Sequence, residues 1–240
     1  MSTPRAGTAV GTVAGLARYP VKGMIGETLE NLRFGWHGPE GDRAFAFLRM
    51  AETGGLPFLS PRRCPGLCRY TTRTTSGDPV VMNPDGDELD VRDPRLLHEI
   101  EHLAGERLHL VRLWSHATDS MDVSLITNAS VTAAGRLVGC PLNPSRFRPN
   151  LVVDTRDDHR DHPEDRWIGR TLKGGDNNTM LHVGRATQRC TVINIDPKTG
   201  LADTDVFATI RGHRKNRLGV YATIQRPGTL TVGDALSVHH

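Results

Sequence analysis

The sequence predicts a mainly β protein, a β-barrel-rich α+β fold with a few short helices. About ten short runs of β-type residues follow one another along the chain. Glycine (25 residues) and proline (15 residues) fall between these runs rather than in one linker, and only two segments have clear helical periodicity. A βαβ fold needs a helix after nearly every strand, so this spacing argues against it.

The first hundred residues begin with short β-type runs. The strands expected here are Val10–Arg18, Ala44–Arg49, Leu67–Thr75, and a hairpin from Pro79–Met82 to Glu88–Val91. The hairpin turns at Asn83-Pro-Asp-Gly-Asp87, where proline and glycine supply the backbone angles that a turn needs.

A helix should follow this hairpin from Pro94 to Ala104. Asp93 is a typical N-cap residue, and Pro94 suits the first helical position because its missing N–H is not needed there. The apolar residues of the segment recur at helical spacing, and Gly105 can close the helix in a left-handed conformation.

The remaining chain again reads mainly as strands. These are Arg107–Leu113, Leu151–Val153, Met180–Val183, Thr191–Ile195, Leu218–Ile224 and Thr229–Val232. One helix should interrupt them, with Asn128 as its N-cap and Gly139 at its end. We expect two parts, an N-terminal β subdomain over residues 1–105 and a core domain over residues 106–240.

Composition excludes several classes of protein. The chain has 240 residues, 37% hydrophobic and 24% charged, which suits a globular protein rather than a disordered one. No apolar run is long enough for a membrane span, and the N-terminus lacks the apolar stretch of a secretory signal. The formal net charge of +3 is small for a protein that grips nucleic acid. We therefore expect a cytoplasmic protein with reduced thiols, no membrane and no nucleic-acid partner, whose ligand is a small molecule.

Four cysteines are candidates for chemistry. Cys64 and Cys68 lack a second ligand pair at zinc-site spacing, so packing is the better interpretation of both, as it is of Cys140. Cys190 is different, because it follows Arg189 and stands directly before the apolar run Val192–Ile195, at the mouth of an expected strand. An adjacent arginine favours the thiolate, which is both a nucleophile and a soft metal ligand. A buried structural cysteine stays the alternative.

Other motifs exclude or limit further chemistry. The chain has neither a GxxxxGK[ST] nor a GxGxxG phosphate loop, and no GxSxG nucleophile elbow. The charged stretch Arg156–Arg166 fits a solvated loop better than a metal site. The basic cluster from Arg211 to Arg217 fits either a solvated surface or the rim of an anion pocket.

Several segments, taken in order, resemble the MOSC family, the domain found at the C-terminus of molybdenum cofactor sulfurases and in amidoxime-reducing proteins. The matching segments are Arg18–Gly23, Gly41–Phe47, Phe58–Leu67, Asp122–Thr127, Ser145–Asn150, Arg189–Cys190, Asp196–Gly200 and Pro227–Asp234. Each is weak alone, but FRPN followed by RC and DPxTG in family order is specific. The resemblance implies a MOSC-like β-barrel core with an N-terminal β-barrel-like subdomain.

The resemblance also implies a molybdenum cofactor, molybdopterin, and assigns roles to residues. Cys190 matches the thiolate ligand of molybdenum, and Asp122 matches an acidic position near the metal that can orient a water or pass a proton. The cofactor-binding positions it implies are Lys22, Arg43, Ser124, Arg148, Asn150 and Arg189. Arginine offers phosphate a planar fork of donors.

On this resemblance we expect a molybdenum-dependent reductase of N-oxygenated small molecules, such as N-hydroxylated amidines. No NAD, flavin or iron–sulfur motif occurs in the chain, so electrons should come from a separate redox protein. Two alternatives remain. One is molybdenum-independent sulfur transfer or C–S bond chemistry, with Cys190 as persulfide carrier or nucleophile. The other is a non-catalytic carrier of the pterin cofactor.

Overall fold

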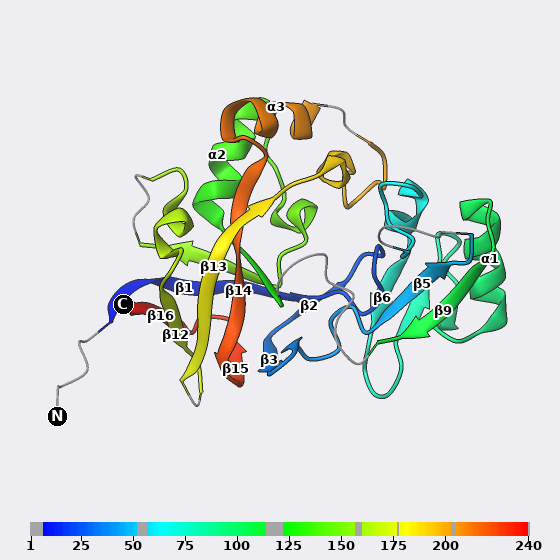
Figure 1. Ribbon diagram of the computed structural model, residues 1–240, viewed down its shortest axis with the longest axis horizontal. Helices are drawn as coiled ribbons and strands as arrows, with labels where there is room; N and C mark the ends of the chain where they lie inside the picture. Colours follow the sequence, from blue (N-terminus) through cyan, green and yellow to red (C-terminus); the bar gives the residue numbers. More distant parts are fainter. Residues whose placement is uncertain are drawn as a thin grey trace.

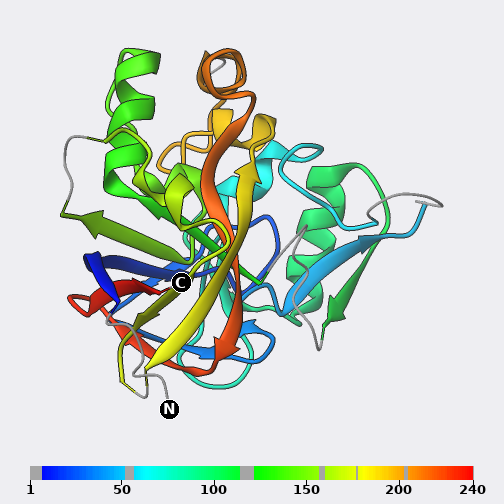
Figure 2. The ribbon, with the colours of Figure 1, turned by 60° about the vertical axis from the view of Figure 1, so that its left-hand side comes forward.

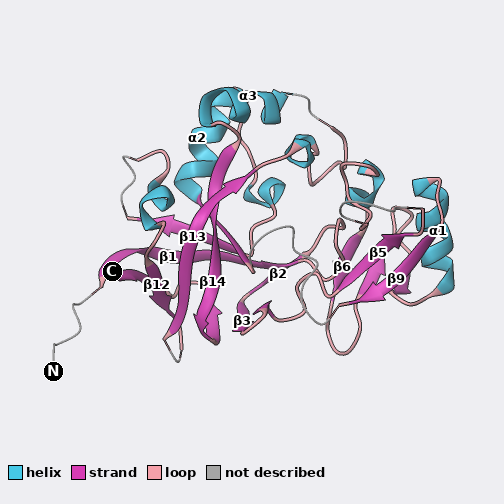
Figure 3. Cartoon of the chain, viewed as in Figure 1, coloured by secondary structure: helices cyan, strands magenta, loops and turns pink. Residues whose placement is uncertain are grey.

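A closed β-barrel and a smaller lobe lie side by side in the computed structural model (Figure 1). The structure describes residues 7–51, 57–113, 122–156, 160–176, 178–202 and 205–239. The barrel lies toward the two chain ends, and the lobe carries α1 on its outer side (Figure 1). Strands dominate both parts (Figure 3). The expected β-barrel-rich fold class is therefore confirmed.

Seven strands form the barrel. They are β1 (Thr8–Arg18), β10 (Val123–Thr127), β11 (Leu151–Thr155), β12 (Thr171–Gly174), β13 (Thr179–Gln188), β14 (Arg217–Arg226) and β16 (Ala235–His239). Their order is β11-β10-β14-β13-β12-β16-β1, and pairing of β1 with β11 closes the ring. The β10–β11 pair is parallel and the other pairs are antiparallel. Closure leaves no exposed sheet edge between these strands.

Alternating side chains fill the barrel. On β14, Val220, Ala222 and Ile224 point inward and join apolar residues from the other barrel strands in one core cluster. Tyr221 lies between them in the sequence, so its side chain takes the outer face. Ser124 of β10 pairs directly with Tyr221 and shares that face. The outer face of β10 and β14 therefore carries polar groups at this level.

The smaller lobe has its own apolar core. Its strands are β5 (Phe45–Arg49), β6 (Thr71–Arg73), β7 (Val80–Met82), β8 (Glu88–Asp90) and β9 (Leu108–Arg112). The helix α1 (Pro94–Ala104) and the 3-10 helix η1 (Pro65–Arg69) pack with them. Cys64 lies in this core cluster and Cys68 is buried on η1, so packing of both cysteines is confirmed.

Two further helices cover one end of the barrel. They are α2 (Asn128–Val138) and α3 (Asp205–Arg214), which stand together above the barrel strands (Figure 2). A third apolar cluster joins them to η2 (Pro144–Phe147) and η4 (Thr191–Asn194), through Phe147 and Ile193. This cluster supports the two short 3-10 helices that build the site described below.

The remaining elements are short. They are β2 (Glu27–Leu29), which pairs with β1; the three-stranded sheet of β3 (Asn31–Gly35), β4 (Gly38–Pro39) and β15 (Gly228–Thr231); and η3 (Pro163–Trp167). Among the described residues, no helix has both the length and the apolar character that crossing a membrane requires.

The helix signals in the sequence are confirmed, with one shift. Asp93 accepts a hydrogen bond from the backbone N–H of Arg95, and Gly105 ends α1 in the left-handed conformation. Gly139 ends α2 in the same way. The N-cap of α2, however, is Thr127 rather than Asn128, because the Thr127 hydroxyl accepts from the backbone N–H of Ser130.

Two strand predictions were wrong. Thr191–Ile195, expected as a strand, begins with η4, since the Ile193 N–H bonds back to the Cys190 carbonyl instead of to a neighbouring strand. Leu67–Thr75 contains only the three-residue strand β6, because Pro65 opens η1 and the chain is helical through Arg69. Both segments are β-rich in composition, and tertiary contacts override that preference.

Two further features depart from expectation. The helix α3 was not predicted, although Val206 and Ile210 give it a buried face. The stretch Arg156–Arg166 was expected as a solvated loop, and residues 157–159 of it lie outside the described residues. The rest is more than a loop, because η3 begins within it and buries Glu164 completely.

The expected division between residues 105 and 106 stays a prediction. The strands themselves do not separate there, because β1 belongs to the barrel formed by the later strands. The small sheet likewise joins β3 to β15, from opposite ends of the chain.

Candidate functional site

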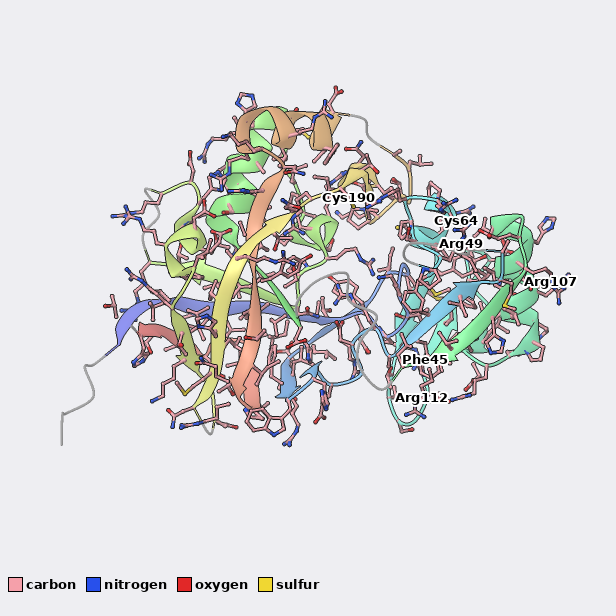
Figure 4. All side chains as sticks on the ribbon, in the orientation of Figure 1. Phe45, Arg49, Cys64, Arg107, Arg112 and Cys190 are labelled. Carbon is pink, nitrogen blue, oxygen red and sulfur yellow. The ribbon has the colours of Figure 1, made fainter. Side chains whose placement is uncertain are left out.

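Cys190 lines a polar hollow beside the barrel. It follows β13, caps the start of η4, and is a free, half-buried thiol. The hollow has a volume of about 650 Å³ and includes Cys190, Arg189 and Tyr221 in its lining. In Figure 4 the thiol lies above the junction between the barrel and the α1 lobe. The side chain therefore faces space on one side and a packed wall on the other.

Arg146 fixes the short helix that starts at Cys190. Its buried guanidinium donates to the carbonyls of Ile193 (3.1 Å) and Asn194 (3.2 Å), and it pairs with Asp196 at 2.8 Å. Asp196 in turn accepts from the backbone N–H groups of Lys198 and Thr199. These bonds, led by that from Lys198, lower the pKa of Asp196 below its usual value. The segments Ser145–Asn150 and Asp196–Gly200 thus meet through Arg146.

Arg189 anchors the chain just before Cys190. Nε donates to the Leu218 carbonyl and Nη1 to the Phe147 carbonyl, each at 2.7 Å. Burial lowers the pKa of Arg189 to about 10, because removing a guanidinium from water disfavours its charged form. Its Nη2 is buried and has no hydrogen-bond partner within the described residues. Arg189 thus mainly positions the backbone, and its Nη2 group remains available to a ligand.

A second arginine pair surrounds Tyr19. The guanidinium carbons of Arg148 and Arg43 lie 4.4 Å and 5.0 Å from the centre of the Tyr19 ring. Burial raises the pKa of Tyr19 to about 12, despite these cations, and its hydroxyl donates to the Pro149 carbonyl at 3.2 Å. Asp42 accepts from the Tyr19 backbone N–H and pairs with Arg43. The tyrosine therefore acts as a spacer that holds two arginines side by side.

Arg148 differs from Arg189 in how its side chain is held. It adopts φ of 50°, the left-handed region that a non-glycine residue enters rarely, which re-aims its side chain at the end of η2. Burial lowers its pKa. Within the described part of the chain, its guanidinium contacts the Tyr19 ring and has no hydrogen-bond acceptor. Such a fork of N–H groups is suited to an oxyanion.

The other predicted cofactor-binding residues divide into two kinds. Lys22 is buried on the lobe side, with Nζ 5.8 Å from the centre of the Phe58 ring. Asn150 is also buried, but its amide is fully used: Oδ1 accepts from the Ser124 N–H and Nδ2 donates to the Ala17 carbonyl. The geometry gives Asn150 the task of joining β1 to β10.

Asp122 and Ser124 occupy the start of β10. Asp122 is half-buried and directly precedes the strand, and Ser124 lies on the outer face beside Tyr221. Tyr221 lines the hollow next to Cys190. The acidic residue is thus placed on the strand whose outer face borders the site.

The structure brings most of the predicted residues around one region. Arg43, Arg148 and Arg189 all act electrostatically on Tyr19, and Arg189 acts on Cys190. Sequence reasoning missed Tyr19, Tyr221 and Arg146 as parts of the site. Tyr19 and Arg146 lie inside the matching segments Arg18–Gly23 and Ser145–Asn150, which is the signal that could have found them. Tyr221 lies outside every such segment.

No metal cluster competes with this site. The described residues contain no group of three or more histidine, cysteine, aspartate or glutamate side chains placed to hold a metal ion. Cys140 lies exposed just after α2 and does not line the hollow that contains Cys190.

Comparison with known families covers nearly the whole chain. A family model described as "MOSC domain" matches residues 112–237, and one described as "MOSC N-terminal beta barrel domain" matches residues 10–124. No curated protein matches the chain significantly.

One solved structure shares the fold. YUAD protein from Bacillus subtilis is similar over 96% of each chain, with 14% sequence identity and a TM-score of 0.54. YiiM from Escherichia coli matches at 13% identity over 93% of this chain and 70% of its own, with a TM-score of 0.43. At that score the YiiM structure carries no argument about this chain.

Proposed function

The chain belongs to the MOSC domain family, and on this premise we propose that it binds a molybdenum–pterin cofactor in the cytoplasm and reduces N-oxygenated small molecules. The observation that carries the proposal is the free, half-buried thiol of Cys190 beside a hollow of about 650 Å³. A thiolate is a soft ligand of the kind that holds a redox-active metal.

Donors in the Cys190 hollow and in the small hollow beside it fit such a cofactor. Nη2 of Arg189 is buried without an acceptor, which favours an anionic guest because a buried donor that lacks a partner is costly. The half-buried guanidinium of Arg148 has no acceptor within the described residues, so its fork of donors is free to bind an oxyanion. Arg148, Arg43 and Lys22 would hold the phosphate of the pterin, and Cys190 would bind molybdenum. Asn150, whose amide is used by backbone groups, would keep β10 in place.

The reaction consumes two electrons and two protons: the N–O bond of the substrate breaks, and its oxygen leaves as water. When bound, the cofactor supplies the two-electron redox centre. The chain itself holds and orients the substrate and moves a proton, and Asp122, half-buried at the start of β10, would orient a water for that transfer. The electrons would come one at a time from a separate redox protein.

Metal analysis of protein made in a molybdenum-replete host and handled without oxygen tests this proposal. We expect molybdenum and the fluorescent oxidised pterin in the wild type and in Cys140→Ser, since Cys140 is exposed and does not line the hollow beside Cys190. Cys190→Ser should lose molybdenum, because an alcohol oxygen is a harder donor than thiolate. Wild-type protein without molybdenum or pterin would contradict the proposal, as would Cys190→Ser that keeps both metal and activity.

Sulfur transfer is the second candidate, favoured by the same open access to Cys190. In that reaction the thiolate attacks a sulfane-sulfur donor, the S–S bond of the donor breaks, and the donor leaves as a thiolate while Cys190 becomes a persulfide. Mass spectrometry after incubation with such a donor separates the two functions. An added sulfur atom confined to the Cys190 peptide would favour transfer, and its absence would count against it.

A further inference from the structure

A different set of arginines lies at the rim of the Cys190 hollow. Arg62, Arg185 and Arg217 line it and are exposed, in contrast to buried Arg189 at its inner end. They come from three places, the loop before η1, strand β13 and the start of β14. All twelve lining residues lie in the described part of the chain, and none of them is a carboxylate. The hollow is therefore cationic from its inner end to its rim.

The nearby acidic groups are engaged elsewhere. Arg214, just before Arg217, pairs with Asp165 at 2.6 Å, and Asp196 pairs with Arg146. Within the described residues, no hydrogen bond or ion pair joins the guanidinium of Arg62 or of Arg217 to another side chain. Arg62 and Arg217 thus carry their positive charge at the rim without a counter-ion among the described residues.

Arg62 and Arg217 lie apart from Arg148, which is assigned to the cofactor phosphate. Arg148 and Tyr19 line a small hollow of about 70 Å³ together with Pro197, whereas Arg62 and Arg217 line the large one, with Arg189 at its inner end. Apolar side chains also face the large hollow, from Ile168, Val192 and Ile193. A ligand that suits this lining has an apolar body and an oxyanion group.

We propose that Arg62 and Arg217 make the hollow selective for N-oxygenated substrates that carry an oxyanion group, a carboxylate or a phosphate, on an apolar body. This inference rests on the proposed function for the reaction itself. The selectivity comes from a cleft lined by one sign of charge, which raises the local concentration of counter-charged ligands. Arg62 and Arg217 are specificity residues in this scheme and take no part in breaking the N–O bond.

A matched pair of alkylating reagents tests the rim without cofactor or turnover. Iodoacetate is an anion and iodoacetamide is neutral, and both react with the same thiolate, so the ratio of their rates at one cysteine cancels the thiolate fraction. Exposed Cys140 provides the internal reference. At low ionic strength we expect the iodoacetate-to-iodoacetamide ratio to be about tenfold higher at Cys190 than at Cys140, and to fall as salt is added.

Charge-removing variants separate the effect of the rim arginines from the effect of the protein's overall charge. In the double variant Arg62→Gln/Arg217→Gln the ratio at Cys190 should fall by about threefold or more, because the cationic lining is weakened. Arg107→Gln is the control for loss of a positive charge elsewhere on the protein, and it should leave the ratio at Cys190 unchanged. Arg107 is exposed in the α1 lobe far from Cys190 (Figure 4). A ratio at Cys190 no higher than at Cys140, or unchanged in the double variant, would overturn the inference.

Turnover then links the rim to the proposed reaction. With metal-loaded enzyme, an aryl amidoxime that carries a para-carboxylate should have a kcat/KM about tenfold above that of the uncharged parent, mainly through KM, and the double variant should remove this preference. If the enzyme reduces neither compound, the proposed function is overturned and the alkylation result still stands. Equal reduction of both compounds by the wild type would overturn the selectivity alone.

Discussion

The arginines that hold the chain around Cys190 and the arginine beside Tyr19 show two uses of one side chain. Around Cys190, Arg189 and Arg146 are buried, and their donors bind the carbonyls of Leu218, Phe147, Ile193 and Asn194. Beside Tyr19, Arg148 stacks on the ring and leaves its donors unused within the described residues. The first two hold the backbone that carries Cys190, and the third offers its donors to a ligand.

This difference follows from local geometry rather than from sequence type. Arg146 and Arg148 are two residues apart in the same segment, Ser145–Asn150, yet Arg146 lies within η2 whereas Arg148 follows it in the left-handed conformation. A buried guanidinium gives most to stability when carbonyls satisfy it, because an unsatisfied one keeps its full desolvation cost. Arg146 and Arg189 should therefore matter for folding, and Arg148 for binding.

The largest expected effect is on folding stability, in Arg189→Met. The methionine keeps the apolar stem but leaves the carbonyls of Leu218 and Phe147 without a donor, so we expect a loss of about 2–4 kcal/mol in the free energy of unfolding. Urea unfolding of the metal-free protein measures it. The stability of Arg189→Lys should lie between those of the wild type and Arg189→Met, because an ammonium cannot bridge both carbonyls. Equal stability of Arg189→Met and the wild type would contradict the structural role given to Arg189.

The next effect is on ligand affinity, in Arg148→Gln. We expect the free energy of unfolding of this variant to stay within about 1 kcal/mol of the wild-type value, because the Arg148 guanidinium contacts the Tyr19 ring and holds no backbone carbonyl. Its affinity for the oxidised pterin phosphate should fall about tenfold, with the loss of a charged fork of donors. Equilibrium dialysis of metal-free protein, followed by pterin fluorescence, reads this directly. A large stability loss with unchanged affinity would reverse the assigned roles.

The fold could be predicted where local signals agree with tertiary contacts. Asp93, Pro94 and Gly105 mark both ends of α1, because capping is decided by neighbouring residues. The segment after Cys190 could not be predicted, since its β-branched residues favour a strand and only Arg146, far away in the sequence, gathers its carbonyls into η4. Closure of the barrel through β1 is equally a long-range event.

The site could be predicted as a set of segments but not as a set of roles. Family order selects Arg148, Asn150, Arg189 and Cys190 together, and the structure gathers them. Whether each residue positions the backbone or faces a ligand depends on whether its donors bind a backbone carbonyl. Asn150 is an example, because its Nδ2 donates to the Ala17 carbonyl. Tyr221 reaches the hollow only because the register of β14 on β10 sets it opposite Ser124.

The smallest effect concerns the acid partner of the buried Arg146. Backbone N–H bonds, first from Lys198, and the charge of Arg146 lower the folded-state pKa of Asp196 below its unfolded value. The carboxylate therefore adds stability that is fully present above the unfolded pKa of about 3.9 and is lost as pH falls through the folded pKa. Because the side chain is one-third exposed (33%), solvent screening limits this contribution to about 1 kcal/mol.

Asp196→Asn isolates that contribution, because the amide oxygen can still accept the turn bonds from Lys198 and Thr199 while the charge on Arg146 loses its partner. Urea unfolding should show the wild type more stable than the variant near about pH 6, with the gap closing near about pH 3 as the wild-type carboxylate takes up its proton. A gap of the same size at both pH values would mean that turn geometry, rather than charge, carries the role of Asp196. The bonds from Arg146 to the Ile193 and Asn194 carbonyls would then hold η4 without a counter-ion, which would make Arg146 resemble Arg189 still more closely.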